Sequence, residues 1–158
     1  MKIVIAYASA GTGHLKAAEA LSHCLKDNHP EVEVKIIDIL TGSNPIFRFA
    51  YRFGYSSLVR YAPWLWSLAF RVTRIRLLLW LTKRLNLVIG RLSIANFAGF
   101  LIGENPDVII STHFTPPEIA AYLKKTGKIK SRLVTVITDF GVHPYWLTVG
   151  TDMYVAAS

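Results

Sequence analysis

Side chains that can move a proton gather at three points of the chain, each directly after an apolar run. A neutral histidine can accept a proton from a hydroxyl group, and an aspartate near it can hold its ring in place. The sequence therefore contains the parts of a general base for deprotonating a substrate hydroxyl. The three groups are Gly11–His14, Ser111–Thr112–His113, and Asp139 with His143 and Trp146.

The first group is a turn of small residues, Gly11, Thr12 and Gly13, that leads into a helical pattern at His14. A glycine turn lets a ligand approach the backbone closely and leaves free N–H groups pointing at it. The helix dipole disfavours an imidazolium ion at this end of a helix, so a neutral imidazole there could act as a base. The alternative is that His14 only caps the helix or packs under a loop.

The glycine turn departs from the common nucleotide-binding signatures. Lys16 stands where the dinucleotide fingerprint needs its third glycine, although Asp38 could take the place of the ribose-binding acid, and no G-K-[ST] of a P-loop follows. A nicotinamide or flavin cofactor is therefore the less favoured alternative. The histidines and Asp139 lack the close spacing of metal ligands, so we expect no metal. The single cysteine, Cys24, excludes an intrachain disulfide and is expected in the core.

The elements that must position these groups follow from apolar periodicity. Continuous apolar runs are typical of strands buried on both faces, and a β-α-β start with a tight turn favours a parallel sheet. We predict an α/β, Rossmann-like, doubly wound parallel sheet with flanking helices. Ligands bind beyond the carboxyl ends of such strands, so the three groups are expected to meet there. The predicted strands are 2–8, 32–40, 106–112, 131–140 and 151–158, and the predicted helices are 14–28 and 116–127.

Residues 42–103, here called the basic segment, interrupt this alternation. Residues 42–105 contain nine arginines and lysines against one acid, Glu104, and so carry the whole formal net charge of +8. Aromatic residues on one helix face and arginines on the other suit a helix that lies in the headgroup layer of an anionic membrane. No uncharged run reaches the about 18–20 residues of a spanning helix. The candidate membrane-binding residues are Arg48, Arg52, Trp64, Trp66, Arg71, Arg74, Arg76 and Trp80.

Two other interpretations of the basic segment remain open. Its helices could belong to the core or to a partner interface, with the arginines on the solvated face. It could also bind nucleic acid, but it is too apolar and too helical in period for that, so we expect no nucleic acid partner. We predict a peripheral protein at the cytoplasmic face of the cell membrane.

Four stretches of the chain resemble the monogalactosyldiacylglycerol synthase and processive diacylglycerol glucosyltransferase family. They occur in the family's order and together span essentially the whole chain. The stretches are "ASAGTGHLKAAEAL" (8–21), "STHFTPPEIAAYL" (111–123), "VITDFGVHPYWL" (136–147) and "TDMYVAAS" (151–158).

The resemblance implies the N-terminal half of a GT-B glycosyltransferase, in which one Rossmann-like domain binds the lipid acceptor and a second binds the nucleotide sugar. It implies that His14 is the general base that deprotonates the 3-hydroxyl of diacylglycerol for an inverting attack on a hexose of a UDP-sugar. Asp139 would orient or support His14. His113, His143 and Trp146 would help to bind the acceptor, around the turn of Gly11–Gly13.

The chain departs from the family in length, because the family is roughly twice as long. We expect residues 1–158 to be the lipid-acceptor domain, with no nucleotide-sugar domain, and to be inactive alone. A partner chain could supply the missing half. The alternative is a non-enzymatic peripheral membrane-binding module or a decayed copy of such an enzyme.

Overall fold

A computed structural model gives the arrangement of the chain. It describes residues 1–158 except residues 10, 42, 94, 140 and 157–158, and it leaves out the side chains of residues 52, 55–56, 66, 70 and 85–94. Five strands form one sheet in the order β2-β1-β3-β4-β5, and every pair of neighbours is parallel. The strands are β1 (Lys2–Tyr7), β2 (Glu33–Asp38), β3 (Val108–Ser111), β4 (Arg132–Ile137) and β5 (Met153–Ala156).

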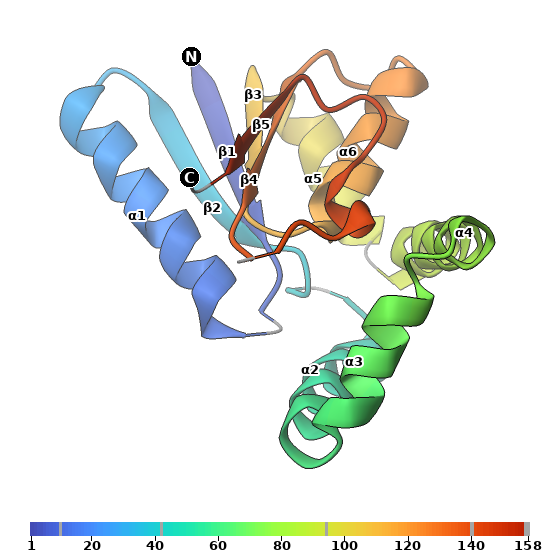
Figure 1. Cartoon of the computed structure of the whole chain (residues 1–158). Coiled ribbons are helices and arrows are strands. Elements are labelled where there is room, and N and C mark those ends of the chain that lie inside the picture. The colour runs from blue at the N-terminus through green and yellow to red at the C-terminus, as the bar shows by residue number, and fades with distance from the viewer. Residues whose placement is uncertain (10, 42, 94, 140, 157–158) are drawn as a thin grey trace.

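Helices cover both faces of the sheet (Figure 1). Helix α1 (Thr12–Asn28) packs through Ala18 on Ile3 and Ile5 of the central strand. Helices α5 (Ala95–Glu104) and α6 (Thr115–Lys125) pack on the other face, where Phe97 and Leu101 join the larger apolar cluster. Strand β1 therefore has no polar face, which explains its unbroken apolar run. The predicted Rossmann-like α/β fold is confirmed, and it is consistent with the N-terminal half of a GT-B enzyme.

The strand order reverses between β1 and β3. The chain passes from β1 to β2 on one side and later returns to β3 on the other side of β1. Loops that leave the two central strands diverge at such a point, and ligands of doubly wound sheets bind there, beyond the carboxyl ends of the strands. The residues after β1 and β3 are the first two of the groups singled out in the sequence.

The basic segment folds into helices α2 (Pro45–Tyr61), α3 (Pro63–Val72) and α4 (Arg76–Ser93), which lie outside the two layers that cover the sheet (Figure 1). Its last part, residues 95–103, was also expected to face a membrane, but it lies in α5, which packs on the sheet through Phe97 and Leu101. Asn44 caps α2 by accepting a hydrogen bond from the Ile46 N–H, and a proline opens both α2 and α3. Among the residues that the structure describes, no helix is both long and apolar enough to cross a bilayer.

Some element boundaries and one burial prediction differ from those expected. The last predicted strand, 151–158, is described as β5 from Met153, and its predicted end at 157–158 lies outside the described residues. Just before β5, the Asp152 carboxylate accepts hydrogen bonds from the Leu133 N–H and Lys124. Within β5, the Tyr154 hydroxyl accepts a hydrogen bond from the Thr148 N–H and donates one to the Thr148 carbonyl. Cys24 was expected in the core, and that was wrong: it lies on the outer side of α1 and is exposed.

Candidate functional site

His14 is the third residue of α1 and lies half-buried at the carboxyl end of the sheet. The helix begins after Gly11, whose backbone is extended, and no side chain caps its first N–H groups. A Cβ atom placed on Gly11 or Gly13 would meet no other atom within 4 Å, so the glycines face open space. The turn therefore leaves the approach to His14 uncrowded on this side.

Hydrogen bonds fix which nitrogen of His14 carries the proton. Nδ1 lies 2.7 Å from the Thr112 carbonyl oxygen and 2.9 Å from the Thr138 hydroxyl. A carbonyl can only accept, so Nδ1–H is the donor and Nε2 of the neutral ring holds a free lone pair. The Thr112 hydroxyl also donates to the His14 carbonyl at 2.9 Å, which locks the two segments together. His14 thus has the tautomer and the fixed ring that a general base needs.

His113 lies directly beside His14 but is fully buried. The two rings meet edge to face with centroids 4.7 Å apart. Nδ1 of His113 accepts the Thr115 N–H at 3.1 Å, so Nε2 carries the hydrogen and points at the Tyr51 hydroxyl, 3.5 Å away. Burial, and then repulsion from the His14 ring whenever that ring is protonated, hold the pKa of His113 well below its usual value. His113 is therefore a neutral packing and hydrogen-bonding group near neutral pH.

Asp139 and Trp146 form a pair on the loop after β4. The Trp146 indole N–H donates to the Asp139 carboxylate at 2.8 Å, and the fully buried Trp146 ring lies 6.2 Å from the His14 ring. The side chain within hydrogen-bond distance of His14 is that of Thr138, the residue before Asp139, and not that of Asp139 itself. The structure thus brings Asp139 into the site through Trp146.

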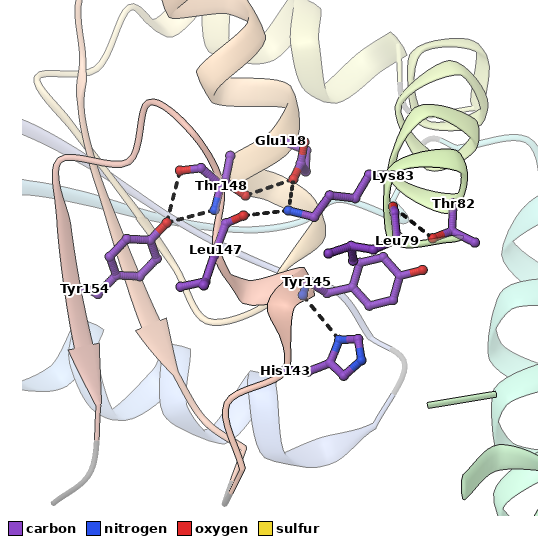
Figure 2. Close-up of polar contacts among 9 residues, drawn as sticks. All are labelled: Leu79, Thr82, Lys83, Glu118, His143, Tyr145, Leu147, Thr148 and Tyr154. Atoms are coloured by element: carbon purple, nitrogen blue, oxygen red, sulfur yellow. Dashed lines mark hydrogen bonds and ion pairs between the residues drawn. The ribbon is translucent and has the colours of Figure 1, made fainter. Parts of the chain in front are cut away.

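His143 repeats the local geometry of His113. Its Nδ1 accepts the N–H of the residue two positions on, Tyr145, as Figure 2 shows, and its Nε2 lies 3.3 Å from the Thr73 hydroxyl. The ring is buried and stacks on Tyr145. His143 therefore faces the basic segment and holds the turn that carries Trp146.

Asp38 was also considered as a ribose-binding acid, and the histidines with Asp139 as metal ligands. Asp38 accepts hydrogen bonds from the backbone N–H groups of Ser9 and Leu40, so it braces the loop that follows β1. Among the described residues, no three His, Cys, Asp or Glu side chains lie close enough together to hold a metal ion.

The candidate membrane-binding residues lie on the exposed side of the basic segment wherever they are described. Trp64 and Trp80 are 68% and 56% exposed. Arg71, Arg74 and Arg76 are exposed as well, and Arg48 is half-buried. The side chains of Arg52 and Trp66 lie outside the described residues. Apolar side chains accompany them on this surface: Ile46, Phe49, Phe53, Leu65, Leu68, Leu77 and Leu81 are all exposed.

Thr138, Tyr51 and Thr73 belong to the site but were not singled out in the sequence. Thr112 was singled out, but it acts on His14 through its backbone carbonyl, which no side-chain pattern reveals. Tyr51 of α2 and Thr73, which follows α3, lie more than 60 residues from their histidine partners. Only the folded arrangement brings these groups together.

The fold and this arrangement define an α/β, Rossmann-like domain that presents a histidine at the switch point of its sheet. The profile of the monogalactosyldiacylglycerol (MGDG) synthase family matches residues 14–158, and the chain belongs to this family. It is 25% identical over 159 residues to a processive diacylglycerol beta-glucosyltransferase of Staphylococcus aureus (strain MRSA252). That alignment covers 99% of this chain but only 38% of the relative. No solved structure gives a significant match.

Proposed function

We propose that this chain forms the lipid-acceptor part of an inverting glycosyltransferase that moves a hexose from a UDP-sugar to diacylglycerol. Membership of the MGDG synthase family and the activity for which the staphylococcal relative is named support this substrate class. The observation that carries the proposal is the state of His14, whose Nδ1–H is tied to the Thr112 carbonyl while Nε2 is left to accept a proton.

In the proposed reaction, Nε2 of His14 takes the proton of the acceptor hydroxyl. The hydroxyl oxygen bonds to the anomeric carbon of the sugar, the bond from that carbon to UDP breaks, and the configuration inverts. The positive charge that forms on the ring is stabilised by the Thr112 carbonyl, which already accepts from Nδ1–H. The open space at Gly11 and Gly13 would admit the hydroxyl and the sugar, and Thr12 completes this turn.

The other candidate residues take supporting roles in this proposal. Asp139 would act through Trp146 by fixing the indole ring near His14. His113 would hold the side of the His14 ring as a neutral neighbour. His143 and Trp146 are buried, so they would act by holding the loop that borders the entrance for the acceptor, next to the helices of the basic segment.

The rest of the enzyme would supply the sugar donor. The chain spans 38% of the length of the staphylococcal relative. We propose that residues 1–158 form the acceptor domain and that the nucleotide-sugar site lies in a further domain or in a partner chain. On its own, the acceptor part would then carry out no transfer.

A second candidate function is a peripheral membrane-binding module without catalysis. It is favoured by one specific observation: many large apolar side chains of α2–α4 are exposed, together with arginines such as Arg71, Arg74 and Arg76. Such a surface suits the headgroup layer of an anionic membrane. We propose the cytoplasmic face, since an exposed, unpaired Cys24 suits a reducing compartment.

Glycosyl transfer tests the first function. The chain, joined to the remaining part of the staphylococcal relative, is assayed for transfer of glucose or galactose to diacylglycerol. His14→Ala should lower the rate by about 10²–10⁴-fold, the range for a lost general base. His23→Ala, an exposed histidine on the same helix, is the matched control. Equal rates for the parent and His14→Ala would refute the assignment of the base.

Co-sedimentation with vesicles tests the second function and the membrane part of the first. Binding to vesicles that contain phosphatidylglycerol, with weak binding to phosphatidylcholine alone, supports a membrane surface. Indifference to lipid charge together with tight binding to a single-stranded oligonucleotide would instead indicate nucleic acid. Binding without any transfer by the joined enzyme would favour the module.

A further inference from the structure

Helices of the basic segment reach the carboxyl end of the sheet through polar side chains. We name the two loops that they reach the β3 loop, residues 112–114, and the β4 loop, residues 138–148. Tyr51 of α2 meets His113 of the β3 loop, and Thr73, which follows α3, meets His143 of the β4 loop. Both loops also contact His14 directly. The exposed helices and the site are therefore mechanically connected.

The shortest of these connections comes from Lys83 on α4. Its ammonium group donates to the Leu147 carbonyl and lies 3.0 Å from a carboxylate oxygen of Glu118, on the first turn of α6. The same oxygen of Glu118 accepts the hydroxyl of Thr148 at 3.0 Å, as Figure 2 shows. Lys83 and Glu118 are largely shielded from water, with side chains 22% and 26% exposed, so their attraction is less screened than that of surface pairs.

Helix α4 has two faces that differ in what they meet. Leu79, Thr82 and Lys83 are half-buried, and Figure 2 shows them on the side that faces the β4 loop, with the Tyr145 ring reaching toward Leu79. Leu77, Trp80 and Leu81 point outward and are exposed. One helix therefore carries both the exposed apolar side chains and the contacts to the β4 loop.

The β4 loop carries the groups that surround His14. Thr138 lies 2.9 Å from its Nδ1, and Trp146 places its ring 6.2 Å from the His14 ring. On the side of the sheet, Tyr154 holds the same loop by bonding both the N–H and the carbonyl of Thr148. The loop is thus held between β5 and α4, and Lys83 is the charged group on the α4 side.

We propose that Lys83 is a positioning residue that ties the β4 loop to α4. When the exposed apolar face of α4 binds a membrane, the contacts of Lys83 then set the position of Trp146 beside His14. The inference rests on the proposed function, because that function gives the outward face its membrane and His14 its role. Lipid binding can shift the loop only if it favours one arrangement of α4 over another, and the Lys83 contacts then carry this preference to the loop.

The test uses the chain labelled with 5-fluorotryptophan and bicelles that contain phosphatidylglycerol. The fluorine signal of Trp146, assigned by substitution to Phe, should move when the wild-type chain binds. In Lys83→Met, which keeps an unbranched apolar stem but lacks the ammonium group, the bicelles should still bind but the Trp146 shift should be lost. Arg84→Met removes an exposed charge from the next position and should keep the shift. Lys83→Arg should restore at least part of it.

The outcomes separate this inference from the proposed function. A Trp146 signal that does not move in the bound wild-type chain, or that still moves in bound Lys83→Met, overturns the inference while the base assignment of His14 stands. Failure of the wild-type chain to bind bicelles overturns both the membrane part of the proposed function and the inference. If Lys83→Met does not fold, Lys83→Gln, whose side chain is polar but shorter and uncharged, replaces it with the same expected loss.

Discussion

The α/β body and the basic segment use apolar residues in opposite ways. In the body, formed by the sheet with α1, α5 and α6, the large apolar side chains pack inward, as Phe97 and Leu133 do. In α2–α4 many of them point outward, as Phe53 and Trp64 do. Both regions are rich in apolar residues, and they differ in what those residues contact. In the body they stabilise the fold, whereas in α2–α4 many of them stay exposed and can contact another surface.

Truncating one phenylalanine in each region tests this difference most strongly. Phe97→Ala should lower the free energy of unfolding by about 3–5 kcal/mol, because a buried ring is replaced by a cavity. Phe53→Ala, at a side chain that is 61% exposed, should change it by no more than about 0.5 kcal/mol and should weaken vesicle binding instead. Urea unfolding and vesicle co-sedimentation measure the two effects. A large loss of stability from Phe53→Ala would show that both regions are core.

Removing positive charge from the corner between α3 and α4 should have the next largest effect. Replacing Arg71, Arg74 and Arg76 by Gln should cost about 1 kcal/mol each in binding to anionic vesicles, or on the order of a hundredfold together. Stability should stay the same, because the three side chains are exposed. Co-sedimentation at several salt concentrations measures the affinity.

The control for this prediction takes the same number of charges from the body. Lys26, Lys125 and Lys128 are exposed lysines of the body, and their replacement by Gln should leave most of the vesicle binding intact. Equal losses from the two triple variants would mean that net charge, and not the basic segment, attracts the membrane.

His113 should make the body less stable in mild acid. The folded protein keeps the buried ring neutral, because its pKa is held well below the usual 6.5, whereas the unfolded chain takes up a proton below pH 6.5. The unfolded state then binds more protons, so the free energy of unfolding falls by about 1.4 kcal/mol for each pH unit below 6.5, until the folded pKa is reached. Denaturant unfolding between pH 7.5 and 5 measures this slope. His113→Gln should have a shallower slope, whatever its stability at pH 7.5, and an unchanged slope would contradict the prediction.

Asp152 should show the smallest effect. The folded protein keeps this carboxyl group charged, whereas it keeps the His113 ring neutral. Lys124, and then the Leu133 N–H, hold the pKa of its carboxyl group below 3.8. Its contribution to stability is therefore present above pH 3.8 and is lost as the pH falls through the lower folded pKa. Asp152→Asn should cost about 1 kcal/mol at pH 7, since the carboxylate is partly exposed, and the difference should vanish in acid. Asp27→Asn, on the outside of α1, should show no such difference.

Much of the fold follows from local patterns. The apolar runs located all five strands, and the glycine turn after β1 predicted where α1 begins. The boundaries were predicted less closely, because they also depend on contacts between distant residues, such as the hydrogen bond from the Leu133 N–H to Asp152 just before β5. A helical wheel separates the two faces of α2 but does not say which one the body covers. The structure has Phe47 and Tyr51 on the core and Phe49 outward.

The site was predicted in outline but not in its contacts. The sequence pointed to Asp139 as the partner of His14, and the structure has Thr138 there. Successive side chains of a strand point to opposite faces. Val134 pairs with Ile110, which packs on the face that α1 covers, so two-residue steps bring Thr138 to the face of α1 and of His14. The register of β4 therefore determines that Thr138, and not Asp139, faces His14.

By itself, the sequence determined the parallel α/β fold, the turn that presents His14, and the concentration of charge in one segment, because strands, turns and helices follow from short-range patterns of size and polarity. The tertiary structure decided which nitrogen of His14 is free, which histidine is buried and neutral, and which face of each helix in the basic segment points outward. These properties depend on groups such as Thr112, Tyr51 and Lys83, which lie far from their partners along the chain and meet them only after folding.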